Sequence, residues 1–370
     1  MAPVHLVRPQ VRAERAYRVP TTVEAEAKVD QNESPYDLPT EVKRAALARY
    51  AEEPWNRYPD DRPHRLVAAL AERAGLPPEG VIVGRGSNEL THTVALCFLE
   101  AGTPVVLPSP MFSLYASVAR MHGARIVDVP AGEAEGFRHD PDAILDAARQ
   151  SGAPLTVVTT PNNPTGQTIA HDDLARLAAG VPGVLLVDEA YHEFLDGPTA
   201  TDLLAEHENV LVMRTFSKAI GLAGVRLGVL LGAPALVQEM EKARLPFLVD
   251  RLGETVGLEV LARPDLVAAR VAELKAERER LEAWAAGLDG VEVVPGAANF
   301  FLLRTPLAPA SLHRRLAERG VLIRDVSGYP ALAGGGGRPG WVRVSVGAPD
   351  ENRAFQSALT GVLAAADIAA

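Results

Sequence analysis

The stretch TFSKAIGLAGVRLG, residues 215–228, places two cations among small and apolar residues. Lys218 follows a predicted buried strand, and Arg226 lies eight positions after Lys218. An amine that is partly desolvated near a guanidinium loses some preference for its charged form, so Lys218 could form a Schiff base. The hydroxyls of Thr215 and Ser217 and the Arg226 fork would suit a phosphate. From the spacing alone, the alternative is a solvated Lys218 and an Arg226 that pairs with a surface acid.

A second candidate lies in VLLVDEAYHEF, residues 184–194, which places Asp188 at the end of an apolar strand and Tyr191 shortly after it. A carboxylate at this position is costly to bury unless a cation or several donors compensate it. Asp188 is therefore expected to bind a metal, to form an ion pair, or to pair with a protonated ligand nitrogen. The histidines show no zinc-site spacing such as H-E-x-x-H, so we expect no metal, which favours the ligand nitrogen.

Two further turns follow predicted strands. In IVGRGSNEL, residues 82–90, glycines lead into a helix whose first N–H groups can bind a phosphate, and Ser87 adds a hydroxyl. A dinucleotide fingerprint would need glycine where Glu89 stands, so a Rossmann NAD site is disfavoured, and an ordinary capped helix is the alternative. In TTPNNPTGQ, residues 159–167, Asn163 could direct its amide into a crevice, although Asn-Pro also simply initiates turns.

One ligand accounts for all four motifs. Pyridoxal 5′-phosphate needs an amine for its aldehyde, a carboxylate for its pyridine nitrogen, donors for its phenolate oxygen and an anion site for its phosphate. Each motif that supplies one of these groups follows a predicted strand. Their joint occurrence predicts this cofactor more strongly than any single motif does.

The motifs require a sheet whose strands end at one edge. The predicted strands are GVIVG (80–84), PVVLP (104–108), ARIVDVP (124–130), LTVVTTP (155–161), VLLVDEA (184–190), VLVMRTF (210–216) and GVRLGVLLG (224–232), and the predicted helices are 88–102, 114–123 and 171–180. Apolar strands without strict alternation predict an α/β fold, in which helices sandwich a mostly parallel central sheet. Ligands of such sheets bind at the carboxyl ends of the strands.

The residues after Pro264 predict a second, smaller α/β unit. They read as a long helix over 265–288, followed by the β-α-β pattern VEVVPGAANFFLLR, SLHRRLAERGVLIRD and WVRVSVG. A chain of 370 residues, 47% of them hydrophobic, also exceeds the usual size of one core. We expect a large cofactor-binding domain over 30–262, an N-terminal arm over 1–29 and a small C-terminal domain over 263–370.

The overall charge limits the kinds of partner that the chain is expected to bind. A formal net charge of −10 argues against a broad basic surface for nucleic acid or a membrane, so the expected partners are small molecules. The single cysteine, Cys97, can form no internal disulfide and is expected in the core. Without an apolar signal-peptide core or a long apolar segment, a cytoplasmic protein is expected.

From about Arg18 to Gly347 the sequence resembles the fold-type I, class I and II pyridoxal-phosphate aminotransferase family. NNPTG, DEAY and TFSKAIGLAGVRLG are shared broadly by that class. DQNESPYDLP, NRYPD, GRGSNEL and GVLIRDVSGYP followed by WVRVSVG are more specific to its histidinol-phosphate aminotransferase group. The resemblance implies transfer of an amino group between L-histidinol phosphate and 2-oxoglutarate in histidine biosynthesis.

The resemblance also implies a role for each motif residue. Lys218 would hold the cofactor covalently and move the proton between substrate and cofactor, and Asp188 would pair with the pyridine nitrogen. The other implied contacts are Tyr191 and Asn163 to the phenolate oxygen, Phe112 stacked on the ring, and Ser87, Asn88, Thr215, Ser217 and Arg226 at the phosphate. Tyr58 of NRYPD would reach the phosphate from the other subunit, which implies an obligate homodimer with shared active sites.

The implied substrate site centres on Arg343. This arginine would bind the carboxylate of glutamate and the phosphate of histidinol phosphate in turn, assisted by Arg324, Tyr17 and Asn32. A guanidinium fork suits both anions. For Arg343 and Arg324 the alternative is a salt bridge within the small domain.

Three other functions would keep most of these motifs. An aromatic amino-acid aminotransferase differs in substrate, and a pyridoxal-dependent decarboxylase or lyase differs in the bond that breaks. A non-catalytic pyridoxal-phosphate sensor would retain the cofactor and release no product.

Overall fold

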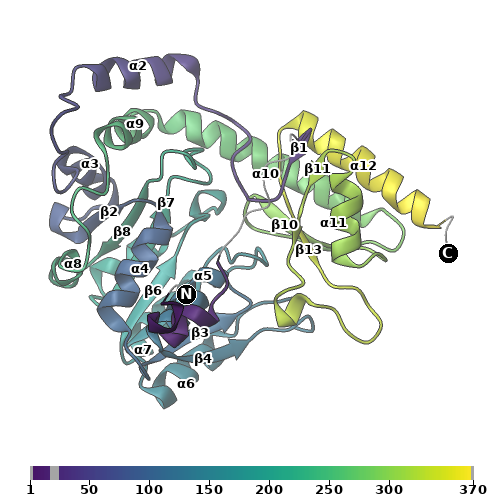
Figure 1. The fold of residues 1–370 in the computed structure, drawn as a ribbon, viewed down its shortest axis with the longest axis horizontal. Helices are drawn as coiled ribbons and strands as arrows, with labels where there is room; N and C mark the ends of the chain where they lie inside the picture. Colours follow the sequence, from purple (N-terminus) through teal and green to yellow (C-terminus); the bar gives the residue numbers. More distant parts are fainter. Residues whose placement is uncertain (1–2, 17–24, 368–370) are drawn as a thin grey trace.

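A seven-stranded sheet forms the centre of the larger unit in the computed structural model, which describes residues 3–16 and 25–367 (Figure 1). The strand order is β2-β8-β7-β6-β5-β3-β4. The bounds are β2 (Val81–Gly84), β3 (Pro104–Ser109), β4 (Arg125–Pro130), β5 (Leu155–Thr159), β6 (Val184–Asp188), β7 (Val210–Thr215) and β8 (Gly228–Gly232). β8 pairs antiparallel with both of its neighbours, β2 and β7, and the other pairs in this sheet are parallel, so the prediction of a mostly parallel sheet is confirmed.

Both faces of this sheet are buried, which explains why its strands are apolar without alternation. In β6, Leu185 and Val187 belong to one hydrophobic cluster and Leu186 belongs to another. The helices of this unit are α2 (Thr40–Ala51), α3 (His64–Ala74), α4 (Ser87–Phe98), α5 (Ser113–His122), α6 (Pro141–Ser151), α7 (His171–Gly180), α8 (Pro234–Glu241) and α9 (Arg251–Leu261). Side chains of α4 and α5 pack in the cluster of Leu186, and those of α3, α6 and α7 pack in the other, so helices cover both faces.

Two sequence expectations differ from the structure. The strand predicted for 224–232 begins only at Gly228, because the residues before it form the loop that carries Arg226. Cys97 was expected in the core, and this is wrong: it is exposed. It lies in the last turn of α4, beyond Ala95, the last buried residue of that helix.

The smaller unit begins with α10 (Pro264–Ala286), which runs from the larger unit towards the smaller one (Figure 1). Its four-stranded antiparallel sheet has the order β12-β13-β10-β9. The bounds are β9 (Glu292–Val294), β10 (Phe300–Arg304), β12 (Arg324–Asp325) and β13 (Val342–Ser345), with α11 (Pro309–Ala317) and α12 (Pro349–Asp367) beside them. A separate pair joins β1 (Ala27–Lys28) to β11 (Val321–Leu322), so residues near the N-terminus pair with the C-terminal unit. This pairing supports our proposed division at about residues 30 and 262.

The remaining described helices are short. They are η1 (Val4–Leu6), α1 (Pro9–Ala13), η2 (Pro78–Gly80), η3 (His192–Phe194), η4 (Ala200–Ala205) and η5 (Pro330–Leu332).

The two units also contact each other through a loop. Phe137, from the larger unit, is fully buried in a cluster with Leu302 and Trp341 of the smaller one. The guanidinium of Arg304 lies 4.1 Å from the centre of the Trp341 ring and forms an ion pair with Glu133. These contacts hold β12 and β13 over the strand ends of the large sheet.

In the described ranges, every helix is too short or too polar to cross a membrane.

Candidate functional site

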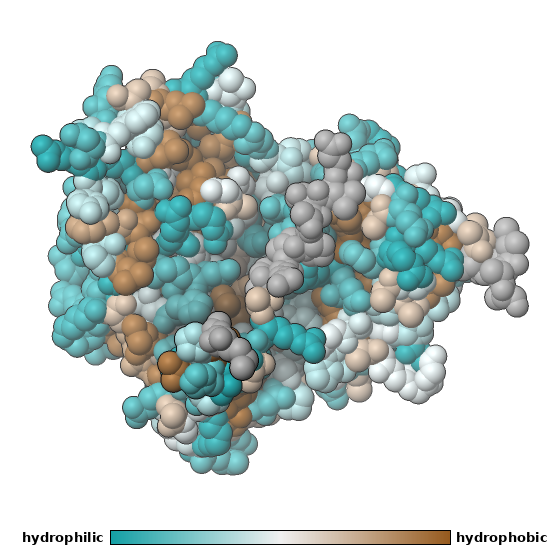
Figure 2. All heavy atoms as spheres, in the orientation of Figure 1, coloured by the Kyte–Doolittle hydropathy of each residue, from teal (hydrophilic) through white to brown (hydrophobic). Residues whose placement is uncertain are grey.

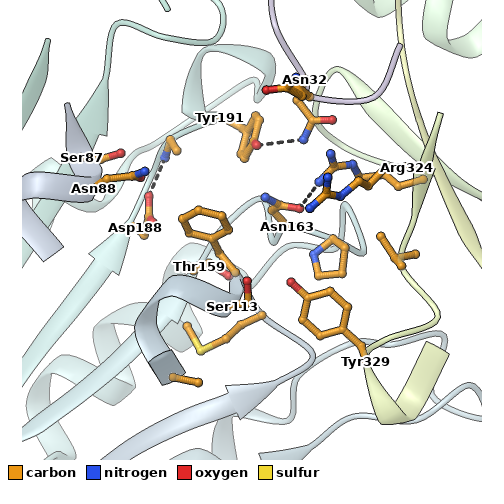
Figure 3. A pocket seen from close by; sticks show the side chains of 18 of the residues that line it. Asn32, Ser87, Asn88, Ser113, Thr159, Asn163, Asp188, Tyr191, Arg324 and Tyr329 are labelled. Carbon is orange, nitrogen blue, oxygen red and sulfur yellow. Dashed lines mark hydrogen bonds between the residues drawn. The ribbon is translucent and has the colours of Figure 1, made fainter. Parts of the chain in front are cut away.

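A cavity of about 880 Å³ lies where the carboxyl ends of the large sheet face the smaller unit. Figure 3 shows side chains from both units pointing into it. The residues predicted to bind the cofactor that line it are Ser87, Asn88, Phe112, Asn163, Asp188, Tyr191, Thr215, Ser217, Lys218 and Arg226. Asn32, Arg324 and Arg343, predicted to bind the substrate, line it as well. The structure thus brings together motifs that lie far apart in the sequence.

Lys218 lies in the loop after β7, where its amine is largely removed from water. Its Nζ donates a hydrogen bond to the carbonyl oxygen of Gln31 at 2.9 Å and lies 5.9 Å from the centre of the Tyr191 ring. Burial, reinforced by the charge of Arg343 and opposed by that of Glu33, lowers the pKa of the Lys218 amine to about 7. A substantial fraction of this amine is therefore neutral, and so nucleophilic, near neutral pH.

Asp188 ends β6 and is buried without a cation. Its Oδ1 accepts a hydrogen bond from the backbone N–H of Ala190 at 3.0 Å, and its Oδ2 accepts one from the hydroxyl of Tyr115 at 2.7 Å. In the described part of the chain no Lys, Arg or His forms an ion pair with Asp188. Burial raises the pKa of this carboxyl to about 6, against the opposing effect of the two hydrogen bonds. Its surroundings therefore favour a ligand that brings its own positive charge.

The start of α4 and the loop before β8 together form a site for an anion. Gly86 precedes α4 with a φ of 81°, and a Cβ at this position would overlap the guanidinium of Arg226. The Nη1 of Arg226 donates to Oγ of Ser217 at 3.2 Å, and Oγ1 of Thr215 donates to the same oxygen at 3.0 Å. No carboxylate of residues 3–16 or 25–367 forms an ion pair with Arg226. Hydroxyls, a free guanidinium and the first N–H groups of α4 thus converge on one place.

Tyr191 and Asn163 lie between this anion site and the smaller unit. The hydroxyl oxygen of Tyr191 accepts a hydrogen bond from Nδ2 of Asn32 at 2.9 Å. Burial raises the pKa of Tyr191 to about 12, so its hydroxyl remains protonated and can donate. Oδ1 of Asn163 accepts from Nη1 of Arg343 at 2.6 Å, which leaves the amide N–H groups of Asn163 able to donate into the cavity.

Arg343 and Arg324 lie opposite each other on the paired strands β13 and β12. Arg343 is only 7% exposed, and its Nη2 donates to the carbonyl oxygen of Asp30 at 2.6 Å, while its buried Nε has no partner. Burial lowers the pKa of the Arg343 guanidinium from its usual value. Neither arginine forms an ion pair with a carboxylate of the described residues, contrary to the salt-bridge alternative. Two arginines without acids therefore face the cavity.

One predicted site residue among the described residues, Tyr58, does not line this cavity. Tyr58 is 78% exposed and stacks on Phe247, with ring centres 4.8 Å apart. A role for Tyr58 at the site of its own chain is therefore not supported by its position. Tyr17 lies outside the described residues.

Sequence reasoning missed Tyr115, which contacts Asp188 from behind the cavity, and Tyr329, which lines the cavity from the loop after β12. Tyr115 lies in the apolar face of α5 with Val118 and Ala119. A tyrosine on the buried face of an amphipathic helix needs a hydrogen-bond partner, and this was the available signal. The partner itself comes from a strand far away in the sequence, so it could not be identified without the fold.

The family described as aminotransferase class I and II matches residues 27–359. The chain belongs to the class I and II aminotransferases. This match confirms the expected family. It also confirms that the chain is a pyridoxal-phosphate-dependent aminotransferase. Among the class I and II aminotransferases, histidinol-phosphate aminotransferase of Chlorobaculum tepidum is 40% identical over 347 residues, which cover 94% of this chain and 97% of that protein.

Solved aminotransferase structures have the same fold. Histidinol-phosphate aminotransferase from Sinorhizobium meliloti, in complex with pyridoxal-5′-phosphate, matches with a TM-score of 0.83 and 26% identity over 96% of this chain and 97% of that one. L-threonine-O-3-phosphate decarboxylase from Porphyromonas gingivalis matches with a TM-score of 0.78 over 90% of this chain and 98% of that one. At 21% identity, the second likeness concerns the fold alone.

Proposed function

We propose that this chain is a histidinol-phosphate aminotransferase, which moves an amino group between L-histidinol phosphate and 2-oxoglutarate through pyridoxal 5′-phosphate in histidine biosynthesis. The observation that carries the proposal is one cavity that holds a lysine of lowered pKa, together with a buried acid and three arginines that form no ion pair with any of the described residues. The relative from Chlorobaculum tepidum, 40% identical over nearly the whole chain, supports the choice of substrate.

The residues of the cavity fit the cofactor group by group. When bound, pyridoxal 5′-phosphate supplies an aldehyde and a protonated ring that withdraws electrons from the substrate. Arg226, with Ser87, Asn88, Thr215 and Ser217, would hold the phosphate. Asp188 would provide the negative charge beside the ring nitrogen. Phe112, Tyr191 and Asn163 would bind or cover the rest of the ring, as the resemblance implies.

Lys218 is suited to move protons. A general acid–base works best when its pKa lies near the working pH, because both protonation states are then populated. The lowered pKa of Lys218, about 7, meets this condition. The carbonyl oxygen of Gln31 fixes the direction of the free amine when no cofactor is attached. We therefore assign the proton transfer at the substrate carbon to Lys218.

Arg343 and Arg324 would select substrates that carry an anion. A phosphate and a carboxylate both accept two hydrogen bonds from a guanidinium, so one buried Arg343 can bind each substrate of the pair in turn. Asn163 and Asp30 hold its two Nη atoms, which limits its movement. Asn32, hydrogen-bonded to Tyr191, connects this part of the cavity to the cofactor site.

We further propose a homodimer in which Tyr58 completes the site of the other subunit. Large apolar side chains are exposed in α2, in the segment that carries Tyr58 and in the segment before α9: Leu47, Trp55, Leu245 and Phe247, of which Phe247 stacks on Tyr58. Figure 2 shows apolar side chains gathered around α2 and α9. A soluble monomer rarely exposes such a group, whereas a second copy of the chain would bury it.

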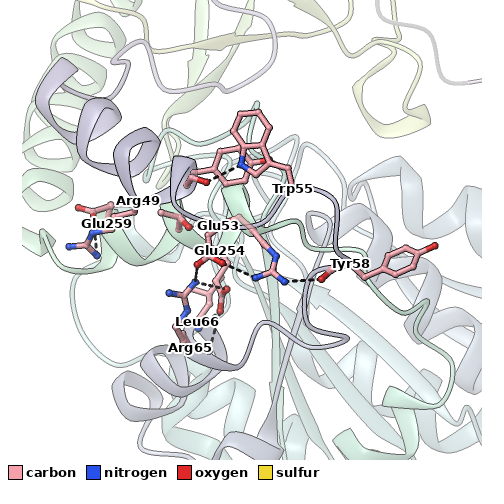
Figure 4. A network of polar contacts seen from close by, with 11 residues as sticks. Arg49, Glu53, Trp55, Tyr58, Arg65, Leu66, Glu254 and Glu259 are labelled. Atoms are coloured by element: carbon pink, nitrogen blue, oxygen red, sulfur yellow. Dashed lines mark hydrogen bonds and ion pairs between the residues drawn. The ribbon is translucent and has the colours of Figure 1, made fainter.

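The segment that carries Tyr58 is held rigidly from behind (Figure 4). Arg251 of α9 donates to Oε2 of Glu53 and to the carbonyl oxygen of Tyr58, each at 2.8 Å. Glu254 accepts from Nη2 of Arg65 at 3.1 Å. These bonds fix the backbone of Tyr58 while its ring projects outward, as a contact to a partner subunit requires.

We also propose that the protein works in the cytoplasm. A chain with one cysteine can form no internal disulfide, which fits a reducing compartment.

Amino-group transfer across a small panel of substrates tests the function. The purified protein, loaded with pyridoxal phosphate, is incubated with glutamate and either imidazole-acetol phosphate or phenylpyruvate, and the amino products are measured. We expect a strong preference for the phosphorylated acceptor. A strong preference for phenylpyruvate would assign the chain to the aromatic aminotransferases, and release of carbon dioxide would indicate a decarboxylase. If glutamate left the absorbance of the bound cofactor unchanged, a sensor would replace the enzyme.

A further inference from the structure

Tyr115 of α5 lies behind the cavity, against the carboxyl group of Asp188. Its hydroxyl donates a hydrogen bond to Oδ2 of Asp188 at 2.7 Å, and the backbone N–H of Ala190 donates to Oδ1 of the same carboxyl. Tyr115 is only 5% exposed and does not line the cavity. It therefore contacts the acid of the site without facing the space where cofactor and substrate would bind.

The surroundings of Tyr115 explain why this bond forms. The side chain packs in an apolar cluster with Met111 and Val118, and its hydroxyl lies 3.6 Å from Sδ of Met213. A hydroxyl buried among apolar groups is costly unless it has a strong acceptor, and a sulfur atom is a weak one. The carboxylate of Asp188 is the strong acceptor within reach. Each of the two buried polar groups thus satisfies the other.

We propose that Tyr115 is a positioning residue, which keeps the carboxyl of Asp188 ionised and fixed in the orientation that the cofactor's ring nitrogen requires. The proposal rests on the proposed function, since it assumes that pyridoxal phosphate occupies the cavity. It assigns a part in the reaction to a side chain that touches neither substrate nor cofactor.

The charges around Asp188 give this bond its importance. Burial raises the pKa of Asp188, the neighbouring charge of Glu189 raises it further, and the hydrogen bonds from Tyr115 and Ala190 oppose the rise. The other titratable groups near Asp188 are Tyr191, three residues on, and Lys218, which shares the cavity. Burial and the charge of Asp188 raise the pKa of Tyr115 well above its usual value, so Tyr115 remains a donor.

Loss of the Tyr115 hydroxyl should change the pKa of Asp188 in one direction. Without this donor the pKa of Asp188 rises further, so a larger fraction of the carboxyl is protonated near neutral pH. A protonated carboxyl offers no negative charge to a protonated ring nitrogen. Binding of pyridoxal phosphate should therefore weaken most at the acidic end of the pH range and recover as the pH rises.

The test compares Tyr115→Phe with the wild-type protein by equilibrium dialysis of pyridoxal phosphate over a series of pH values. We expect the ratio of the two dissociation constants, variant over wild type, to be about tenfold near pH 6 and to fall towards one as the pH rises. The titration of Lys218 is common to both proteins and cancels in this ratio. A ratio that is the same at every pH, whatever its size, would mean a purely structural role and would overturn the proposal.

Tyr36→Phe is a matched control. The hydroxyl of Tyr36 donates to the carboxylate of Glu273, and Tyr36 does not line the cavity, so the chemical change is the same at a different place. Its ratio should stay near one at every pH. A pH-dependent ratio like that of Tyr115→Phe would overturn the proposal, because loss of any such hydroxyl would then suffice.

A double-mutant cycle with Asp188→Asn tests whether Tyr115 acts through the carboxyl. In the Asp188→Asn background position 188 has no carboxyl that can titrate. The added Tyr115→Phe change should therefore produce no pH-dependent effect on the dissociation constant. An undiminished effect there would overturn the proposal. If Tyr115→Phe does not fold, as judged by circular dichroism, Thr91→Val takes its place. The Thr91 hydroxyl lowers the pKa of Tyr115, so its loss makes Tyr115 a weaker donor and should shift the ratio in the same direction.

The outcome for the wild-type protein separates this inference from the proposed function. Failure of the wild-type chain to bind pyridoxal phosphate at any pH would contradict the proposed function itself. Binding by the wild type, with no pH-dependent loss in Tyr115→Phe or Thr91→Val, would contradict only the role of Tyr115.

Discussion

Two side chains of the cavity have pKa values that burial moves towards neutrality from opposite directions. The pKa of Lys218 falls to about 7 and that of Asp188 rises to about 6, in each case chiefly because the charged form loses water. Such pairs are concentrated at functional sites, since a structural core has no need of them. The chemistry at this scale therefore depends on keeping water away from two particular groups.

The lowered pKa of Lys218 predicts unusual reactivity. Only the neutral amine reacts with acetic anhydride, and Lys218 becomes neutral as the pH rises through about 7. In the protein without cofactor, competitive acetylation at a series of pH values should therefore give half-maximal labelling of Lys218 near pH 7. Exposed lysines of the same sample are the reference, because a lysine in water titrates near pH 10.4. Labelling of Lys218 that runs parallel to theirs would refute the effect of burial.

Arg343→Lys tests the anion site of the smaller unit. Lysine keeps the positive charge but cannot reproduce the planar fork, so the KM of the phosphorylated substrate should rise about tenfold or more. The matched control is Arg338→Lys, in the same unit, where the arginine pairs at the surface with Glu133 and Glu292. Surface ion pairs contribute little, so its KM should stay within about twofold of wild type. Equal effects of the two substitutions would argue against a substrate contact at Arg343.

At the scale of elements, α4 and the loop before β8 must approach closely to form the anion site. Gly86 and Gly228 permit this, because a Cβ on Gly228 would overlap the backbone of Gly86 and a Cβ on Gly86 would overlap Arg226. The glycines of GRGSNEL thus do more than begin a helix. They allow the guanidinium of Arg226 to lie directly beside the first turn of α4.

Gly86→Ala should weaken binding of pyridoxal phosphate about tenfold or more, because displacement of Arg226 removes a charge-assisted hydrogen bond to the phosphate. Gly102→Ala is the control. Both glycines have positive φ values, 81° and 85°, so alanine strains the backbone in each case, but at Gly102 it meets no atom within 4 Å. Unfolding measures the loss of stability in each variant, and dialysis should show weaker cofactor binding only in Gly86→Ala. Weaker binding in both variants would mean that backbone strain, and not displacement of Arg226, causes the effect.

The sequence was sufficient to predict the elements that bear the motifs, because buried strands such as β6 have a strong apolar signal and glycines or polar residues mark their ends. It was sufficient also to predict most residues of the cavity, since parallel strands end at one edge. The bond between Tyr115 and Asp188 could not be predicted, because it depends on how α5 lies on the sheet. The exposure of Cys97 was missed for the same reason, because it depends on which side of α4 faces the sheet.

At the scale of the whole molecule, the two units contribute different residues to the cavity. The larger unit supplies Lys218 and Asp188, and the smaller unit supplies Arg343 and Arg324. Phe137, buried in the smaller unit's cluster, and Glu133, paired with Arg304, hold the units together beside the cavity. Both units are therefore needed to form the cavity.

A shared active site predicts complementation between inactive variants. Lys218→Ala and Tyr58→Ala, unfolded together and refolded as a mixture, should recover about a quarter of the wild-type sites, because each mixed dimer has one intact site. Lys218→Ala mixed with Arg343→Ala is the control, since both residues belong to the cavity of one chain and no mixed dimer has an intact site. Activity in the control mixture, or none in the first, would contradict the proposed role of Tyr58 across the interface.

Covalent attachment of pyridoxal phosphate to Lys218 is the central claim, and borohydride reduction followed by peptide mass spectrometry tests it most directly. Freshly purified protein should be yellow, and after reduction the peptide that contains Lys218 should carry the mass of the reduced cofactor, with no such label in Lys218→Ala. A colourless protein after incubation with pyridoxal phosphate, or a label found on another lysine instead, would contradict the account.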